Sequence, residues 1–215
     1  MRNIDSYTHT RGESVYLDDI PEIAGTLNAA VYGSPEAHGI IKQLHLDDAL
    51  AVKGVVKILT NKDIPGKNQI GGIVKDEPLL ADGVVHFNGM PVAIVVAENA
   101  DAAHEAVKKI KIDIEPLPVV TLARVAQQNG ALIVPPRTFK IGDSQSAFAQ
   151  CKYIFEGIAE TNGQEHLYIE TQGAYAIPVE NGAIKIYSST QGPTAVQKHC
   201  AEVLDVPMHK VEIDT

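Results

Sequence analysis

Tryptophan is absent from this sequence, and cysteine occurs only twice in its 215 residues. Cys151 and Cys200 lie too far apart for the paired spacing of a zinc site or an iron–sulfur cluster. We expect both to be ordinary buried thiols in a reducing cytoplasm. No apolar run approaches the roughly 20 residues that span a bilayer, and the first residues lack the apolar core of a secretory signal. These absences predict a cytoplasmic protein without a membrane segment.

Clusters of basic residues are also missing. The net charge is −9, and no stretch has the excess of Lys and Arg that binding to phosphates requires, so we expect no nucleic-acid partner. Hydrophobic residues make up 45% of the chain and charged residues 21%, which is typical of a soluble globular protein. The length is sufficient for one large core or two small ones.

Local catalytic signatures are equally scarce. The sequence contains no glycine-rich dinucleotide fingerprint, no phosphate-binding loop and no nucleophile elbow. None of the histidines has a metal-ligand spacing, and we interpret them as surface or ordinary core residues. They are His9, His38, His45, His86, His104, His166, His199 and His209. The residue pattern alone therefore assigns no catalytic residue and no metal ligand.

Turn signals and periodicity predict alternating strands and helices in the first half of the chain. The predicted strands are 27–32, 39–46, 55–60, 84–87, 92–97 and 111–115. The run 92–97 is almost wholly apolar, which predicts a strand buried on both faces. One helix is expected to begin with Asp47 as its cap, and a second is capped by Asn99. The second helix carries an apolar stripe of Ala102, Ala103, Ala106, Val107 and Ile110.

The second half begins with a connector, residues 119–142, in which Pro135 and Pro136 form a stiff break. A short helix capped by Asp143 is expected to follow. The predicted strands are 152–159, 173–178, 183–189 and one that begins at 211. Asn181 and Gly182 predict a tight turn, and Pro193 suits the first turn of a helix over 193–204. The buried stripe predicted for this helix is Ala195, Val196, His199, Cys200, Val203 and Leu204. The class is α/β or α+β, in two pieces that divide near 120–140.

The densest polar segment in an apolar setting lies between residues 162 and 173. Its polar members are Gln164, Glu165, His166, Glu170, Thr171 and Gln172. They form either a hydrogen-bonded turn network or a loop that faces a ligand, and spacing alone favours the network. A second segment, 188–194, places hydroxyl residues and glycine before a helix. That pattern can hold an anion, but an ordinary helix cap is the favoured interpretation.

Taken together, several strings resemble the large subunits of the xanthine dehydrogenase and aldehyde oxidoreductase family. Those that resemble the opening domain are residues 12–21, 34–39, 50–56, 76–81, 89–97 and 115–118. Those that resemble the start of the molybdopterin-binding domain are Gly142-Asp143, Gly163-Gln-Glu-His-Leu-Tyr-Ile-Glu-Thr171 and Ser188-Ser-Thr-Gln-Gly-Pro193. They occur in the family's order and cover nearly the whole chain.

The resemblance implies an α+β protein with an α/β-hammerhead domain at 1–120, a connector at 121–142 and an incomplete molybdopterin-binding domain at 143–215. Its function would be that of a xanthine dehydrogenase-like hydroxylase, with water as the oxygen source and a purine favoured over an aldehyde as substrate. One site residue carries over, Gln164, whose amide would donate to an oxygen on the molybdenum without adding charge. Glu165, His166 and Glu170 would hold its loop.

The resemblance also implies parts that this sequence lacks. The glycine-rich, Phe-containing loop over the cofactor, the substrate-binding Glu and Arg, and the Glu that acts as base have no counterpart here. The 2Fe–2S clusters and FAD would lie on other domains or subunits, which would be the chain's partners. We therefore expect a fragment that is inactive alone, binds no cofactor alone and self-associates as a homo-oligomer. The alternative is a non-catalytic scaffold that docks partner subunits.

Overall fold

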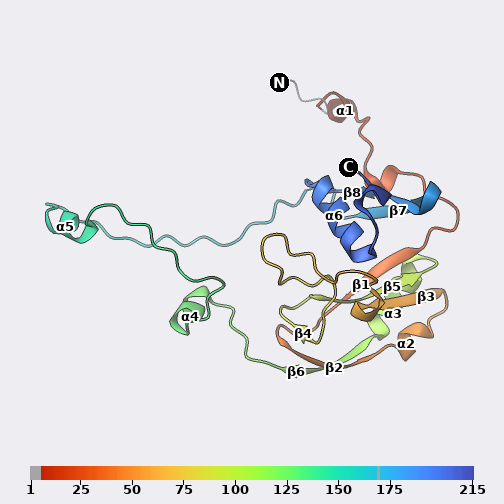
Figure 1. Ribbon diagram of the computed structural model, residues 1–215, viewed down its shortest axis with the longest axis horizontal. Helices are drawn as coiled ribbons and strands as arrows, with labels where there is room; N and C mark the ends of the chain where they lie inside the picture. Colours follow the sequence, from red (N-terminus) through yellow and green to blue (C-terminus); the bar gives the residue numbers. More distant parts are fainter. Residues whose placement is uncertain (1–5, 169) are drawn as a thin grey trace. The chain divides into compact units, whose positions relative to one another are not determined.

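The computed structural model describes residues 6–168 and 170–215. Within it, the chain forms two compact units (Figure 1). The first combines the residues up to 119 with those from 169 onward, and the second is 120–168. The sequence predicted a division near 120–140, but not that the last part of the chain would join the first.

The first sheet of the first unit has the order β1-β5-β3 and is antiparallel throughout. Its strands are β1 (Asn28–Gly33), β5 (Pro91–Ala97) and β3 (Val55–Thr60). The central strand β5 is the predicted apolar run, and its Val95 and Ala97 are fully buried. Helix α3 (Ala100–Lys109) packs on this sheet, and the Asn99 side chain accepts a hydrogen bond from the Ala102 N–H at 2.9 Å, as the predicted cap requires.

Helix α2 (Asp47–Leu50) lies beside α3. The predicted cap at Asp47 is wrong, because the helix starts one residue earlier than expected. Leu46 is the N-cap and Asp47 the first helical residue, where its carboxylate complements the helix dipole. The α3 stripe is confirmed, since Ala102, Ala103, Ala106 and Ile110 are buried and Val107 packs against the same cluster.

A second antiparallel sheet has the order β4-β2-β6. Its strands are β4 (Val84–Val85), β2 (Gly39–His45) and β6 (Lys111–Pro116). Met90 and Val92 from the chain around β5 pack with Val85 and with Ile112 and Ile114 of β6. The two sheets therefore share the apolar chain around β5. Short single-turn elements complete this part: α1 (Ser6–Arg11), η1 (Leu17–Asp19) and η2 (Asn61–Asp63).

The third sheet, also in the first unit, has the order β7-β8-β9. Strands β7 (Ala174–Val179) and β8 (Ala183–Ser188) form a hairpin through η3 (Glu180–Gly182), where Asn181 has the positive φ of 59° that the sequence predicted. Helix α6 (Pro193–Leu204) and η4 (Met208–Lys210) lead to β9 (Val211–Asp214), which is parallel to β8. Pro193 begins the helix as expected.

The buried stripe predicted for α6 is only partly correct. Ala201 is the buried residue of this helix, while His199, Cys200, Val203 and Leu204 are half-buried and Ala195 is exposed. The helix contacts its sheet mainly near its second half, where Ala201 packs with Ile186 and Val211. Because the first turn has little to pack against, the periodic apolar pattern overstated its burial.

The second unit is built differently. It contains α4 (Ala123–Gln128) and α5 (Ser144–Ala149), and none of its residues is buried. Asp143 caps α5 as predicted, accepting hydrogen bonds from the backbone of Gln145 and Ser146. The Ser146 hydroxyl also donates to its carboxylate at 2.6 Å, and this bond, followed by those from the backbone, holds the pKa of the carboxyl below the ordinary value. Helix α4 was not predicted inside the connector. The strand predicted at 152–159 is wrong, because these residues are irregular and pair with no strand.

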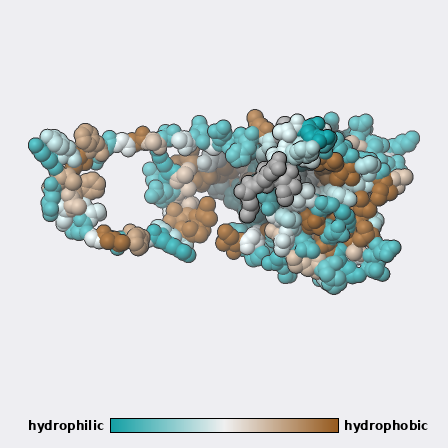
Figure 2. All heavy atoms as spheres, turned by 90° about the horizontal axis from the view of Figure 1, so that it is seen from above, coloured by the Kyte–Doolittle hydropathy of each residue, from teal (hydrophilic) through white to brown (hydrophobic). Residues whose placement is uncertain are grey.

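The mixture of helices with antiparallel and mixed sheets confirms the α+β class. The thiol prediction is partly wrong, since Cys151 is exposed and Cys200 is only half-buried. Figure 2 shows apolar side chains on the surface of the molecule. In the second unit, Ile133, Phe139 and Phe155 are each at least 88% exposed.

Candidate functional site

The segment around Gln164 lies in the irregular part of the second unit, and its side chains are exposed. The Glu165 carboxylate accepts a hydrogen bond from the adjacent His166 N–H at 2.9 Å, and Leu167 has a positive φ of 52°. Gln164–His166 belong to the second unit and Glu170–Gln172 to the first, so a network across the segment stays a prediction. Position 169, inside the same string, lies outside the described residues.

Glu170, near the end of the string, binds the first residue of η1. Its Oε1 accepts a hydrogen bond from the Leu17 N–H at 2.8 Å. The Leu17 side chain also covers Gly173 so closely that a Cβ at that glycine would collide with it. Two segments about 150 residues apart in sequence are thereby joined, which agrees with a structural role for Glu170.

Ser189, at the end of β8, anchors the other side of this stretch. Its Oγ accepts from the Gly173 N–H at 3.0 Å and donates to the Thr171 carbonyl at 2.8 Å. Thr190 accepts from the Gly192 N–H at 3.1 Å, and Gly192 is the N-cap of α6. The hydroxyls of Ser189 and Thr190 therefore bind the local backbone, although no side chain caps α6, whose N-cap is Gly192.

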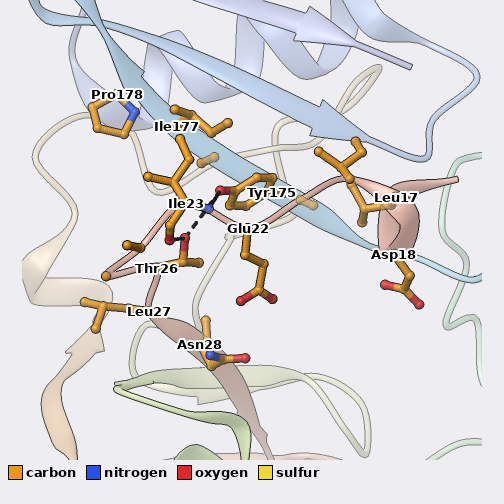
Figure 3. A pocket seen from close by; sticks show the side chains of 16 residues that line it. Leu17, Asp18, Glu22, Ile23, Thr26, Leu27, Asn28, Tyr175, Ile177 and Pro178 are labelled. Atoms are coloured by element: carbon orange, nitrogen blue, oxygen red, sulfur yellow. Dashed lines mark hydrogen bonds between the residues drawn. The ribbon is translucent and has the colours of Figure 1, made fainter. Parts of the chain in front are cut away.

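A cavity of about 890 Å³ opens in the first unit between residues 17–29 and strand β7 (Figure 3). Tyr175 lines this cavity. Its hydroxyl accepts a hydrogen bond from the Ile23 N–H at 2.9 Å and lies 3.3 Å from the Thr26 hydroxyl. Asp18 and Glu22 are the charged residues of its lining. Sequence reasoning missed this cavity, because its walls are far apart in the chain and carry no motif.

Neither location encloses a molybdenum cofactor. A metal dithiolene is anionic, and the carboxylates of Asp18 and Glu22 would repel it in the cavity. Gln164 has the right chemistry, a neutral amide donor, but within its own unit no buried surface surrounds it. Among the described residues, no group of three or more His, Cys, Asp and Glu side chains could hold a metal ion.

The sequence model for the a/b hammerhead domain of aldehyde oxidase and xanthine dehydrogenase matches residues 11–118. The model for the molybdopterin cofactor-binding domain matches residues 125–215. This chain belongs to the aldehyde oxidase and xanthine dehydrogenase family. The expected hammerhead and cofactor-binding folds are thereby confirmed in the expected order.

The family's relatives are much longer than this chain. Xanthine dehydrogenase of Emericella nidulans is 34% identical over 212 residues, which are 97% of this chain and 16% of that protein. Aldehyde oxidase 2 of Rattus norvegicus is 36% identical over 213 residues, which are 98% of this chain and 16% of the relative. The chain thus spans about a sixth of the length of these relatives.

Solved structures show the same relation. The aldehyde oxidoreductase from Desulfovibrio gigas is 27% identical, has a TM-score of 0.84 and is matched over 98% of this chain and 25% of its own. The quinoline 2-oxidoreductase from Pseudomonas putida 86 is 27% identical with a TM-score of 0.83, over 98% of this chain and 29% of its own. In the described part of this chain, no helix is long and apolar enough to cross a membrane.

Proposed function

We propose that this chain supplies the hammerhead domain and the first part of the cofactor-binding domain of a molybdenum hydroxylase. The observation that carries the proposal is the two domain matches in the family's order, 11–118 and 125–215. The proposed domain limits are 1–120, a connector at 121–142, and 143–215. In this proposal the chain acts as part of a larger protein and is inactive alone, which is supported by its span of 16% of the relatives' length.

In that protein, Gln164 is the proposed contact to the molybdenum cofactor, which supplies the two-electron oxidation when bound. An exposed amide can donate an N–H to the cofactor without bringing a net charge to a redox centre. The position of Gln164 in the string Gly163-Gln-Glu-His166 supports this role. The Glu170 carboxylate, six residues further on, accepts a hydrogen bond from the Leu17 N–H at 2.8 Å and so fixes the end of the string.

The proposed substrate is a purine, oxidised with water as the oxygen source. The relatives include both xanthine dehydrogenases and aldehyde oxidases, so substrate choice rests on residues of the larger protein. Electrons would leave through 2Fe–2S clusters and FAD on partner domains or subunits. We further propose a cytoplasmic homo-oligomer.

The test is a substitution at Gln164 in the native protein, with the cofactor loaded. Gln164→Ala should lower kcat for xanthine by about a hundredfold, because a preorganised donor to the reacting centre is lost. Gln128→Ala, at an exposed position on α4, is the matched control and should keep the wild-type rate. A wild-type rate in Gln164→Ala would remove Gln164 from the site.

The same preparations decide the substrate class. The ratio kcat/KM should be higher for xanthine than for an aromatic aldehyde, and the reverse order would overturn the purine proposal. A native protein that oxidises neither compound would favour the scaffold alternative instead.

A further inference from the structure

The end of helix α6 is completed by a loop from the hammerhead domain. A helix leaves its last four carbonyls without partners inside the helix. The Ala201 carbonyl accepts from the Val206 N–H at 3.0 Å, within the same segment. The next two carbonyls accept hydrogen bonds from a distant part of the chain. The Gly66 N–H donates to the Val203 carbonyl and the Lys67 N–H donates to the Glu202 carbonyl, each at 2.9 Å.

Gly66 approaches the helix too closely for any side chain. A Cβ at this position would collide with the Glu202 carbonyl oxygen and lie 2.9 Å from the Val203 oxygen and the Asp205 nitrogen. These atoms are all backbone and cannot rotate away. In the same loop, a Cβ at Gly72 would meet nothing within 4 Å. Gly71 is crowded only within the loop, by the Val74 carbonyl and the Gln69 side chain, so among these three glycines the close contact with α6 belongs to Gly66.

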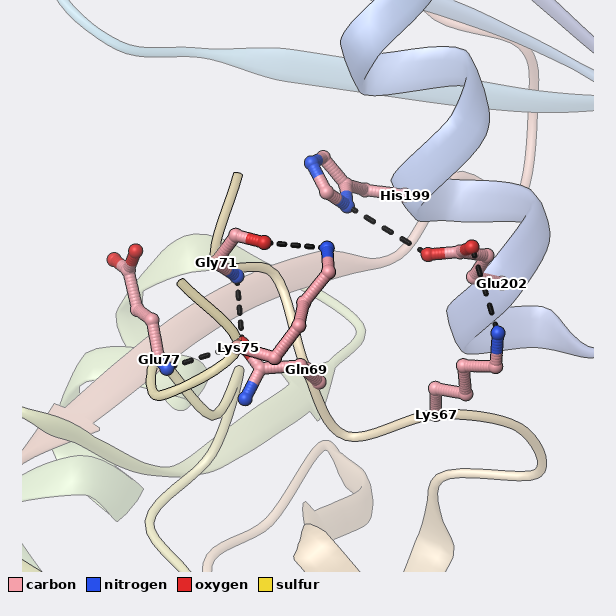
Figure 4. Close-up of polar contacts among 7 residues, drawn as sticks. All are labelled: Lys67, Gln69, Gly71, Lys75, Glu77, His199 and Glu202. Carbon is pink, nitrogen blue, oxygen red and sulfur yellow. Dashed lines mark hydrogen bonds and ion pairs between the residues drawn. The ribbon is translucent and has the colours of Figure 1, made fainter. Parts of the chain in front are cut away.

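The loop is held in shape by its own side chains (Figure 4). Gln69 Oε1 accepts from the Gly71 N–H at 2.6 Å and from the Glu77 N–H at 3.0 Å. Asn68 bridges the base of the loop, where its amide bonds both the N–H and the carbonyl of Leu80. The donors of Gly66 and Lys67 are thus presented by a preorganised loop.

The side chains add a charged contact at the same point. Lys67 Nζ lies 3.5 Å from Glu202 Oε1, and His199 Nδ1 lies 4.0 Å from Glu202 Oε2. Figure 4 shows Glu202 between the two. Lys67 is largely exposed, so this ion pair is weak, and the two backbone hydrogen bonds carry the contact.

We propose that residues 64–67 form an interdomain latch, by which the hammerhead domain caps α6 of the cofactor-binding domain, and that Gly66 is its positioning residue. The latch sets where α6 lies, and α6 follows β8 in the chain and leads through η4 to β9. Ser189 at the end of β8 in turn holds Thr171 and Gly173. The inference rests on the described contacts and does not depend on the proposed reaction.

The test is amide hydrogen exchange, followed residue by residue by NMR, on the chain as it stands. In the wild type, the Gly66 and Lys67 amides should exchange at least about tenfold more slowly than the Gly72 amide, because they are hydrogen-bonded to α6. Equal rates in the wild type would overturn the latch.

Two matched variants sharpen the test. Gly66→Ala should speed exchange of the Lys67 amide and of the last turn of α6 by about tenfold or more, while β5 keeps its protection. Gly72→Ala should leave all of these rates unchanged. Wild-type exchange at Lys67 in Gly66→Ala would contradict the proposal. If Gly66→Ala also loses protection in β5, the substitution has destabilised the whole unit. The exchange rates of the Gly66, Lys67 and Gly72 amides in the wild type then decide whether the latch exists.

Discussion

The two units of this chain differ in burial far more than in composition. The first unit contains all the buried hydrophobic residues of the described chain, and all of them except Leu80 belong to three clusters. The second has apolar side chains as large, among them Ile133, Phe139 and Phe155, yet leaves them exposed. Apolar residues stabilise a fold only where a partner surface removes them from water. The second unit therefore lacks a partner surface rather than apolar residues.

The largest difference between the two units is expected in the free energy of unfolding, when a carboxylate replaces an apolar side chain in each. Val95 is fully buried in β5, whereas Val134 is 62% exposed in the second unit. Val95→Asp should cost several kcal/mol and unfold the first unit, because it buries an unpaired carboxylate. Val134→Asp should change the free energy of unfolding by less than about 0.5 kcal/mol. Urea denaturation measures both, and equal losses would mean that the second unit has a core of its own.

Exposed apolar surface should also make the chain self-associate. Light scattering of the 215-residue chain at rising concentration should show dimers or larger species. Phe139→Ser and Phe155→Ser together should weaken this association about tenfold, since both rings lie open to water. A monomer across the whole concentration range would show that these side chains are covered within the chain.

A smaller effect is expected where the string 163–171 meets the first unit. Glu170→Gln should lower stability by about 1 kcal/mol, because the Leu17 N–H loses a charged acceptor. Glu165→Gln changes the same residue type in the same string but touches only its neighbour His166, so its midpoint in urea should equal the wild type. A shift of equal size in both variants would remove the special role of Glu170.

The smallest effect concerns the two thiols, one in each unit. Burial raises the pKa of the Cys200 thiol above its ordinary value, whereas Cys151 is exposed. Because the thiolate is the reactive form, a raised pKa lowers the reactive fraction at pH 8. Alkylation followed by mass spectrometry should label Cys151 about tenfold faster, and the gap should narrow as the pH rises through the raised pKa. Faster labelling of Cys200 would contradict its burial.

The sequence correctly predicted those helix ends, turns and strands that depend on residues close together in the chain. The cap at Asn99, the turn at Asn181 and the helix start at Pro193 all follow from local backbone chemistry. The buried strand β5 followed from its apolar run. The family resemblance, drawn from short strings spread along the chain, was confirmed by both domain matches.

What failed depends on distant contacts. Residues 152–159 have a strand-like pattern but no strand to pair with, and a single extended segment is not a sheet. The α6 stripe was overstated, since Ala195 in its first turn is exposed and Ala201 is the buried residue of the helix. Neither the cavity beside Tyr175 nor the contact of Gly66 with α6 has a local signature, since each joins segments more than 130 residues apart. The role of Gln164 stays a prediction.

Elemental analysis of the native protein that carries this chain tests the functional proposal most directly. We predict stoichiometric molybdenum in that protein and none above background in the isolated 215-residue chain, whose own residues do not enclose the cofactor. A native protein without molybdenum would contradict the proposed function, and stoichiometric molybdenum in the isolated chain would contradict the claim that its site is incomplete.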